Sequence, residues 1–178
     1  MTVTVKAVTV DSLADEMEPC LEEISLDERK EVADYCRAKR KWFEKATSKY
    51  GVCAFVAYLD EQPTGLVEFL PVNAVPYPEE RPRDTVFILC SYVVAKNQKK
   101  GVGRNLFRHL IEFLKTSSLS YFGGRKAMAI EVYVPKVDPS WPPNIQFPTG
   151  SKEFYEKLGF RLKKELPKQK GYLYRLEL

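Results

Sequence analysis

The pattern of hydrophobic and polar positions predicts strands and helices along the whole chain. Strands are indicated where β-branched and polar residues alternate, or where short apolar runs are bounded by turn residues. These segments are 3–10, 52–59, 65–70, 86–94, 127–134, 160–166 and 172–178. Apolar residues at helical spacing indicate helices at 12–24, 25–51, 102–115 and 151–158. The predicted order is β-αα-β-β-β-α-β-α-β-β, with residues 60–64 as a hairpin loop.

Local signals indicate where the first two helices begin. Ser12 followed by Asp15 resembles a capping box, and Ser25 followed by Glu28 forms a clearer one. Pro19 has no backbone N–H, so we expect it to kink or divide the first helix. The pattern therefore predicts two separate helices between the first and second strands.

The segment 86–94 is apolar on both faces, which is typical of a central strand. It is followed by the run Gln98-Lys99-Lys100-Gly101-Val102-Gly103-Arg104 and then by the third predicted helix. The first amides of a helix have no partners inside the helix, and the helix dipole places partial positive charge there. Glycine lets this backbone approach a bulky anion, and the basic side chains add charge. The turn therefore suits a phosphate or pyrophosphate.

Composition indicates one soluble globular domain over residues 1–178. The chain has 44% hydrophobic and 29% charged residues, with no internal repeat or domain boundary. Its net charge of +4 is too small to argue for nucleic acid, and the basic run 37–41 reads as a solvated helix face. No apolar run approaches a membrane span, and the N-terminus lacks a signal peptide's apolar block.

The cysteines and the histidine exclude several kinds of site. The four cysteines are widely spaced without a CxxC pair, so we expect reduced thiols in the cytoplasm instead of disulfides or a zinc site. Cys90 is interpreted as a packing residue. The single histidine, His109, is expected to be a surface or packing residue, and we expect no metal site.

Three local motifs, in this order, carry a resemblance to a known family. Gln98-x-x-Gly101-x-Gly103 follows the central strand and matches the pattern [QR]xxGx[GA]. Ile130-Glu131-Val132 lies on the strand after the next helix, and Phe154-Tyr155-Glu156-Lys157-Leu158-Gly159-Phe160 closely matches lYekxGF. Together with the element order, these motifs make the chain similar to the GCN5-related N-acetyltransferase (GNAT) family, over about residues 1–178.

The resemblance implies a fold and a cofactor. The implied fold is α/β (α+β), a mixed, mostly antiparallel, twisted sheet of about seven strands flanked by four helices. The implied cofactor is acetyl-CoA, with coenzyme A as product, lying like an extra strand beside the central strand. Main-chain groups of the strand would contact the pantetheine arm and acetyl carbonyl, and amides of the glycine turn would hold the pyrophosphate. The expected cofactor-binding residues are Ser91, Tyr92, Val93, Gln98, Lys99, Lys100, Gly101, Val102, Gly103 and Arg104.

The resemblance also implies catalytic roles. Tyr155 matches the family tyrosine whose hydroxyl protonates the leaving thiolate. Glu131 matches a strand glutamate that serves as the base in ribosomal-protein N-terminal acetyltransferases of this family, and it is the candidate we prefer from the sequence. Glu68, on the second strand of the hairpin, is the rival. A chain of waters without a dedicated residue is the third alternative.

The chain departs from the family pattern at three places. Ala95 stands where the family often has proline, and Pro148 stands where an asparagine usually bonds the cofactor. Asn144 could substitute for that asparagine. The loop 136–150 is longer than the usual connection. We expect Trp141, Phe147 and the prolines of this loop to form a stiff aromatic wall over the acceptor site, or the loop to be a surface insertion or a homodimer contact.

We therefore expect an enzyme that transfers an acetyl group from acetyl-CoA directly to the primary amine of a small molecule or peptide. The alternative is a non-catalytic acyl-CoA-binding or sensing module on the same fold. Retention of Tyr155 and of two candidate carboxylates favours the enzyme. The acceptor stays open among small amines, polyamines, antibiotics, amino acids and protein N-termini.

Overall fold

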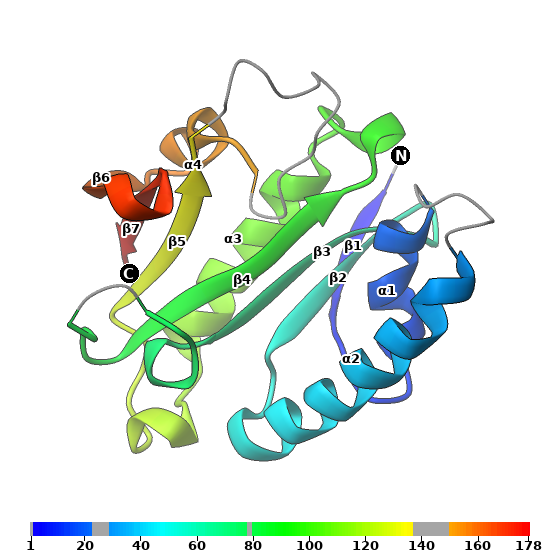
Figure 1. Cartoon of the computed structure of the whole chain (residues 1–178), viewed down its shortest axis with the longest axis horizontal. Helices are drawn as coiled ribbons and strands as arrows, with labels where there is room; N and C mark the ends of the chain where they lie inside the picture. The colour runs from blue at the N-terminus through cyan, green and yellow to red at the C-terminus, as the bar shows by residue number, and fades with distance from the viewer. Residues whose placement is uncertain (1, 23–28, 78–79, 137–149) are drawn as a thin grey trace. The chain divides into compact units, whose positions relative to one another are not determined.

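A computed structural model describes the chain except for residues 1, 23–28, 78–79 and 137–149 (Figure 1). The strands are β1 (Val3–Ala7), β2 (Ala54–Leu59), β3 (Gln62–Pro71), β4 (Thr85–Val93), β5 (Ala129–Pro135), β6 (Arg161–Leu166) and β7 (Gly171–Glu177). The α-helices are α1 (Leu13–Leu21), α2 (Arg29–Tyr50), α3 (Val102–Thr116) and α4 (Lys152–Lys157). This order of elements confirms the predicted one.

The strands form one mixed sheet in the order β1-β2-β3-β4-β5-β7-β6. Strand β4 is the fourth of the seven and therefore central, as its apolar sequence predicts. β4 pairs with β5 in parallel, whereas β1–β2, β2–β3, β5–β7 and β6–β7 are antiparallel. The predicted fold class is confirmed.

The chain divides into two compact units, which are described separately. The first comprises residues 1–68 and 92–110, and the second comprises residues 69–91 and 111–178. The division falls inside β3, β4 and α3, so each unit holds part of these elements. The expectation of a single domain over 1–178 stays a prediction.

In the first unit, a tight turn makes the hairpin between β2 and β3. Asp60 and Glu61 both have positive φ, at 49° and 68°. Two consecutive residues of this kind are typical of a type I′ turn, whose twist matches that of the flanking strands. Strand β3 therefore begins at Gln62, and the predicted loop 60–64 is too long.

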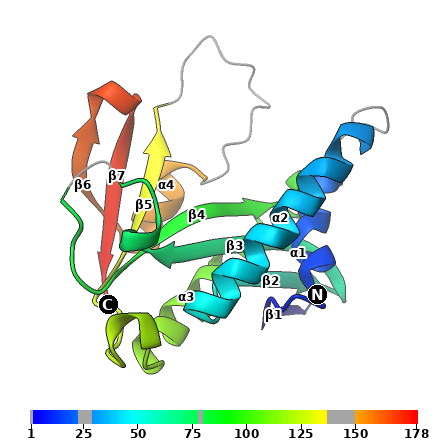
Figure 2. The same cartoon turned by 60° about the horizontal axis from the view of Figure 1, so that its bottom comes forward.

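The helices α1 and α2 lie side by side in this unit, and α1 contacts β2 (Figures 1 and 2). Ser12 precedes α1, but its side chain makes no capping bond because Ser12 Oγ accepts from Thr9 N at 2.9 Å. Pro19 is buried inside α1, and the helix continues to Leu21. The predicted capping bond and a division of the helix at Pro19 are therefore wrong, while a kink at Pro19 stays a prediction. Ser25 and Glu28 lie outside the described residues.

In the second unit, β7 lies between β5 and β6 (Figure 2). The β5–β7 ladder runs from Ala129 opposite Glu177 to Pro135 opposite Gly171. Gly171 has no room for a side chain, because an added Cβ would lie 2.3 Å from the Tyr133 ring. This close packing fixes the far end of β5.

Helix α3 follows the glycine turn, as predicted. Its buried side chains include Leu106 and Phe107 in the first unit and Leu114 in the second. His109, in the first unit, contacts the Phe55 ring edge-on at 4.8 Å, in agreement with a packing role. No disulfide joins the four cysteines, and in the described part of the chain no helix is long and apolar enough to cross a bilayer.

Candidate functional site

The turn before α3 presents backbone amides at the start of a helix. Helix α3 begins at Val102, and the amide of Asn105 donates to Gly101 O at 3.0 Å. The amides of Val102, Gly103 and Arg104 come before this first bond of the ladder, where amides have no helical acceptor. They form the positive end of a helix of 15 residues, an arrangement suited to an anion.

Two residues of this turn have a left-handed backbone conformation. Lys99 has φ 61° and Gly101 has φ 85°. Side-chain bonds hold the turn in place: Gln98 Nε2 donates to Val93 O at 3.1 Å, and Asn105 Nδ2 donates to Gly101 O at 3.0 Å. Gln98 therefore ties the turn to the end of β4.

Three basic residues predicted to meet the pyrophosphate are exposed at this turn. They are Lys99, Lys100 and Arg104. Gly65 on β3 lies close by, because an added Cβ there would be 2.9 Å from Tyr92 O and 3.2 Å from Val102 Cγ1. The end of β4 and the start of α3 thus pack tightly on β3 within the first unit.

In the second unit, β4 and β5 separate beyond a short ladder. Their parallel pairing covers Thr85–Ile88 and Ala129–Val132. Both strands continue past these pairs, β4 to Val93 and β5 to Pro135. The peptide groups that follow the ladder can therefore bond a molecule lying along the strands.

The hydroxyl of Tyr155 lies beside β4 beyond this ladder. Tyr155 is completely buried in α4, and its hydroxyl is 2.9 Å from Ser91 Oγ. Phe160 N donates to Tyr155 O at 3.0 Å, and the two rings meet edge-on at 5.2 Å. Gly159, with φ 95°, makes this reversal possible. Burial raises the pKa of Tyr155, while its hydrogen bond to Ser91 acts in the opposite direction.

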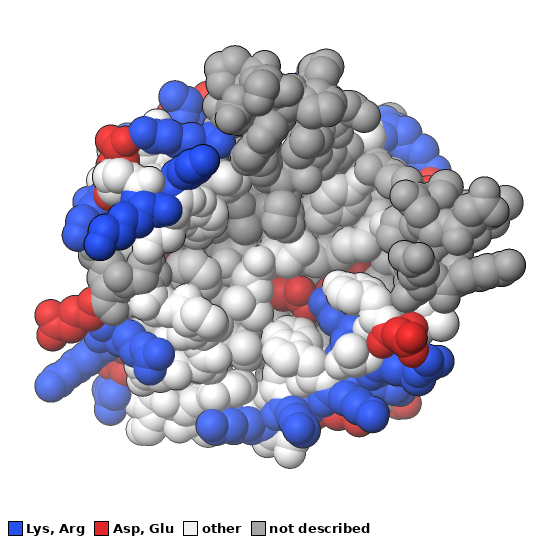
Figure 3. Space-filling view, in the orientation of Figure 1, with Lys and Arg blue, Asp and Glu red and all other residues white. Residues whose placement is uncertain are grey.

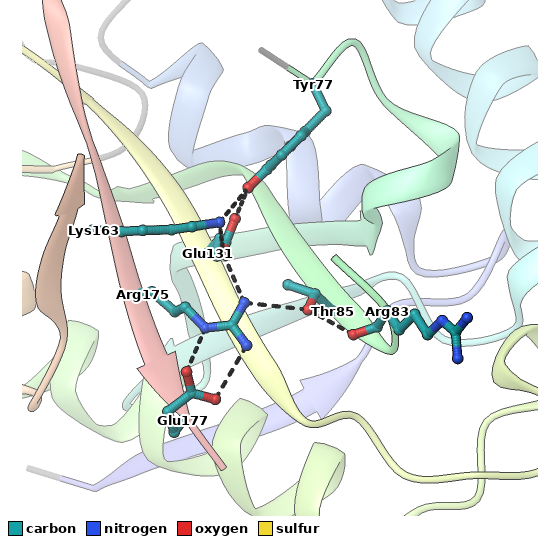
Figure 4. Close-up of polar contacts among 7 residues, drawn as sticks. All are labelled: Tyr77, Arg83, Thr85, Glu131, Lys163, Arg175 and Glu177. Carbon is teal, nitrogen blue, oxygen red and sulfur yellow. Dashed lines mark hydrogen bonds and ion pairs between the residues drawn. The ribbon is translucent and has the colours of Figure 1, made fainter. Parts of the chain in front are cut away.

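Glu131 lies on β5 inside a network of donors (Figure 4). Its carboxylate is completely buried. Oε1 accepts from Lys163 Nζ at 2.9 Å and from Arg175 Nη1 at 2.7 Å, and Oε2 accepts from the Tyr77 hydroxyl. These donors fill three of the roughly four lone-pair sites of the carboxylate, and two of the donors are cations.

Arg175 extends this network along β7 (Figure 4). It is directly opposite Glu131 in the β5–β7 register. Its guanidinium also bonds Glu177, through Nε at 2.5 Å and Nη2 at 3.1 Å, and Nη1 lies 3.4 Å from Thr85 Oγ1. Glu131 therefore joins strands of the second unit through charged hydrogen bonds.

Glu68 belongs to a different cluster, in the first unit. Lys39 Nζ on α2 donates to Glu68 Oε1 at 2.5 Å and lies 3.4 Å from Oε1 of Glu16 on α1. Glu16 is 1% exposed, and among the described residues neither of its oxygens accepts a hydrogen bond. Burial first, and the charge of Glu68 second, raise the pKa of Glu16 to about 7. One lysine thus serves two carboxylates, and Glu16 holds a proton near neutral pH.

Lys39 is the exception in the basic run 37–41. Figure 3 shows Lys and Arg side chains along α2, and Arg37, Arg40 and Lys41 are exposed as expected of a solvated face. The side chain of Lys39 is 12% exposed. Burial lowers the pKa of Lys39, but the charges of Glu68 and Glu16 outweigh burial and raise it. Lys39 is therefore a charged part of the interior.

The family model of the Acetyltransferase (GNAT) family matches residues 10–134. The chain belongs to the GNAT acetyltransferase family. It is therefore an N-acetyltransferase. A comparison with curated proteins gives no match.

Solved structures share the fold of this GNAT chain at low sequence identity. The PaiA N-acetyltransferase from Thermoplasma acidophilum, in complex with coenzyme A, is 13% identical with a TM-score of 0.62, and the match covers 100% of both chains. The ribosomal-protein-S18-alanine N-acetyltransferase from Escherichia coli is 14% identical with a TM-score of 0.57, covering 99% of this chain and 94% of that one. An N-acetyltransferase from Staphylococcus aureus Mu50 is 14% identical with a TM-score of 0.59, covering 99% of each chain.

The structure places the predicted GNAT site residues in separate local groups. The first unit holds the glycine turn with Tyr92 and Val93, and it also holds Glu68. The second unit holds Ser91, Tyr155 and Glu131, and brings Ser91 and Tyr155 into contact. The loop positions discussed from the sequence, Trp141, Asn144, Phe147 and Pro148, lie outside the described residues.

Sequence reasoning missed the partners of the carboxylates. Glu16 and Lys39 are charged residues whose helical spacing places them on the same face as apolar residues. Glu16 follows Leu13 by three residues, and Lys39 precedes Phe43 by four. A charge on an apolar helix face is a signal for a buried pair. The pairing of Arg175 with Glu131 had no comparable local signal, because it depends on the strand register.

Glu16→Gln is expected to stabilise the protein above pH 7. The pKa of about 7 in the folded state lies above the ordinary glutamate value of 4.5, so the stability of the wild type falls as pH rises through this window. Glutamine cannot ionise and avoids this loss, which is on the order of 3 kcal/mol at pH 8. Thermal melts at pH 5 and pH 8 measure the effect, and the gain of the variant over the wild type should be largest at pH 8 and below about 1 kcal/mol at pH 5.

The control for this substitution is Glu18→Gln, an exposed glutamate on the same helix. It should leave the pH dependence of the melting temperature unaltered. A Glu16→Gln variant whose stability follows the wild type from pH 5 to pH 8 would show that Glu16 is ionised throughout this range.

Proposed function

We propose that the chain transfers an acetyl group from acetyl-CoA directly to a primary amine, releasing coenzyme A. Membership of the GNAT family supports acetyl transfer in general. The observation that carries the proposal further is the buried hydroxyl of Tyr155, 2.9 Å from Ser91 on the strand that leaves the β4–β5 ladder. A proton donor at this place suits protonation of a leaving thiolate.

The cofactor is proposed to bind through backbone groups. The amides of residues 99–104, with the basic side chains of Lys99, Lys100 and Arg104, suit the two phosphates of acetyl-CoA. The peptide groups of Ser91, Tyr92 and Val93 are proposed for the pantetheine arm and the acetyl carbonyl. The coenzyme A complex of the similar PaiA structure supports this choice of cosubstrate.

The contacts favour Glu68 over Glu131 as the group that receives the amine's proton. Glu131 accepts from Tyr77, Lys163 and Arg175, and the two cations favour the ionised carboxylate over one that has taken up a proton. Glu68 accepts from Lys39, and Glu16 beside it already exchanges a proton near neutral pH. A group that exchanges a proton near neutral pH next to Glu68 suits a site of proton transfer. Glu131 as base stays a prediction from the sequence, and ordered water is the third alternative.

The pH dependence of kcat/KM distinguishes the two glutamates. A base must be deprotonated to act, so Glu68→Gln is expected to flatten the acidic limb of the profile. Glu131→Gln is expected to keep the limb and to lower Tm, because Lys163 and Arg175 would then face a neutral amide. A flattened limb in Glu131→Gln alone would restore that residue as the base, and an unchanged limb in both variants would leave ordered water.

Two measurements test the overall function. Titration calorimetry should show acetyl-CoA binding to the full chain, and free-thiol release should accelerate with at least one member of a panel of small amines, polyamines, amino acids and peptides. Absence of binding would refute the proposal. Binding without any accelerated thiol release would favour the non-catalytic module. The acceptor, the cytoplasmic location and a homodimer stay predictions from the sequence.

A further inference from the structure

The side chain of Ser91 reaches the hydroxyl of Tyr155 in a buried place. Ser91 Oγ and Tyr155 OH are 2.9 Å apart, Ser91 is 8% exposed and Tyr155 is completely buried. A hydrogen bond shielded from water is costly to lose, because bulk water cannot replace the missing partner. The bond, in which either hydroxyl can donate, therefore holds the phenolic oxygen of Tyr155 beside Ser91.

The Tyr155 ring packs against aromatic side chains of the second unit. The rings of Phe154 and Phe160 contact it edge-on, with centroids 5.3 Å and 5.2 Å away. Such a place disfavours the phenolate that remains when a tyrosine gives up its proton. A hydroxyl that donates to this oxygen counteracts the penalty without bringing a second charge into the interior.

We propose that Ser91 is a positioning residue for acetyl transfer, aiming the Tyr155 hydroxyl and stabilising the tyrosinate that forms when it protonates the thiolate. The inference rests on the proposed function, because Tyr155 must be the proton donor. It adds a side-chain role to a residue expected to contribute only main-chain groups.

The step balances as follows. The amine nitrogen forms a bond to the acetyl carbon, the C–S bond breaks, and its electron pair goes to sulfur. The Tyr155 proton moves to sulfur and gives the thiol of coenzyme A. The amine's surplus proton goes to the base or to water. Ser91 Oγ–H donates to the tyrosinate until a proton from water restores the phenol.

The direction of the pKa shifts agrees with this role. Burial raises the pKa of Tyr155, which opposes release of its proton, and the bond from Ser91 lowers it. Removing the serine hydroxyl should therefore slow proton release without affecting how acetyl-CoA binds. An effect of this kind appears in kcat and leaves KM unchanged.

The test compares Ser91→Ala and Ser91→Thr in the wild-type and Tyr155→Phe backgrounds. Free-thiol release from acetyl-CoA is measured with methylamine, spermidine and glycylglycine as acceptors. The fastest acceptor is then used for all variants. Where no amine accelerates thiol release, hydrolysis of acetyl-CoA by water is measured instead. Ser91→Ala is expected to lower kcat by about tenfold to hundredfold, with the KM for acetyl-CoA unchanged. Ser91→Thr keeps the hydroxyl and should restore most of kcat.

The double variant separates positioning from a general structural role. If Ser91 acts through Tyr155, Ser91→Ala should have no further effect once Tyr155 is phenylalanine. The control is Ser118→Ala, an exposed serine that should leave kcat unchanged. Where Ser91→Ala melts below the assay temperature, Ser91→Cys, of similar size and a weak donor, takes its place in the comparison.

The outcomes are distinguishable from failure of the proposed function. A wild type that does not bind acetyl-CoA in calorimetry would refute both. Binding and turnover together with a wild-type kcat in Ser91→Ala would overturn the role of Ser91 alone. The same loss in both backgrounds, or no recovery in Ser91→Thr, would also overturn it.

Discussion

Tyr155→Phe is expected to lower kcat by about 10²- to 10³-fold, the usual effect of removing a general acid, with little change in affinity for acetyl-CoA. The substitution removes one oxygen and keeps a ring that is completely buried between Phe154 and Phe160. Packing therefore changes little, and the loss falls on the step in which the thiolate takes a proton. Steady-state kinetics of thiol release measure kcat, and calorimetry measures the affinity.

A matched control comes from the other unit. Tyr58 is also buried, and its hydroxyl bonds Asp15 Oδ2 at 2.6 Å. Tyr58→Phe removes a hydroxyl of the same kind and should leave kcat within about twofold of the wild type. Equal kcat in Tyr155→Phe and in the wild type would return Tyr155 to a packing role.

Gly101→Val is expected to weaken acetyl-CoA binding by about 100-fold, through a backbone cost of roughly 1–3 kcal/mol and obstruction of the phosphates. Gly101 has φ 85°, which a β-branched residue avoids. Among the described residues, an added Cβ would meet the side-chain amide of Asn105 at an ordinary 3.7 Å. The expected loss therefore comes from a change in the conformation of the turn and from the valine side chain obstructing the phosphates, and calorimetry with acetyl-CoA measures it.

Gly124→Val controls for the backbone strain. Gly124 has φ 80°, and an added Cβ would meet nothing within 4 Å. The two variants should lose similar stability in thermal melts, while only Gly101→Val loses affinity. Unchanged affinity in Gly101→Val would mean that the turn does not hold the pyrophosphate.

The order of elements could be predicted because its signals are local. The apolar segment of β4, the glycine that ends α2 and the reversal from Tyr155 to Phe160 are all visible within a few residues. The errors arose where two local signals competed. Ser12 Oγ accepts from Thr9 N instead of capping α1, and Pro19 is accommodated on the buried face of the helix.

The partners of the site residues could not be predicted, because their contacts join residues far apart in the sequence and no local signal identifies the partner. A motif names Tyr155, but the contact with Ser91 joins residues 64 positions apart in the chain. Glu131 meets Arg175 because of the β5–β7 register, and Glu16 meets Lys39 because α1 and α2 pack together. These contacts place Glu131 in an ion network, while its role as base stays a prediction from the sequence.

The short β4–β5 ladder, with acetyl-CoA bound beside it as proposed, makes the stability of the folded chain depend on the acetyl-CoA concentration. The ladder stops at Ile88 and Val132 although both strands continue, so with acetyl-CoA along them, as proposed, the cofactor completes part of the sheet. A ligand that binds only the folded state stabilises it by about 2.7 kcal/mol at a hundredfold excess over Kd. When acetyl-CoA is scarce, the chain loses both its substrate and this stabilisation, so the amount of intact enzyme would follow the supply of activated acetyl groups.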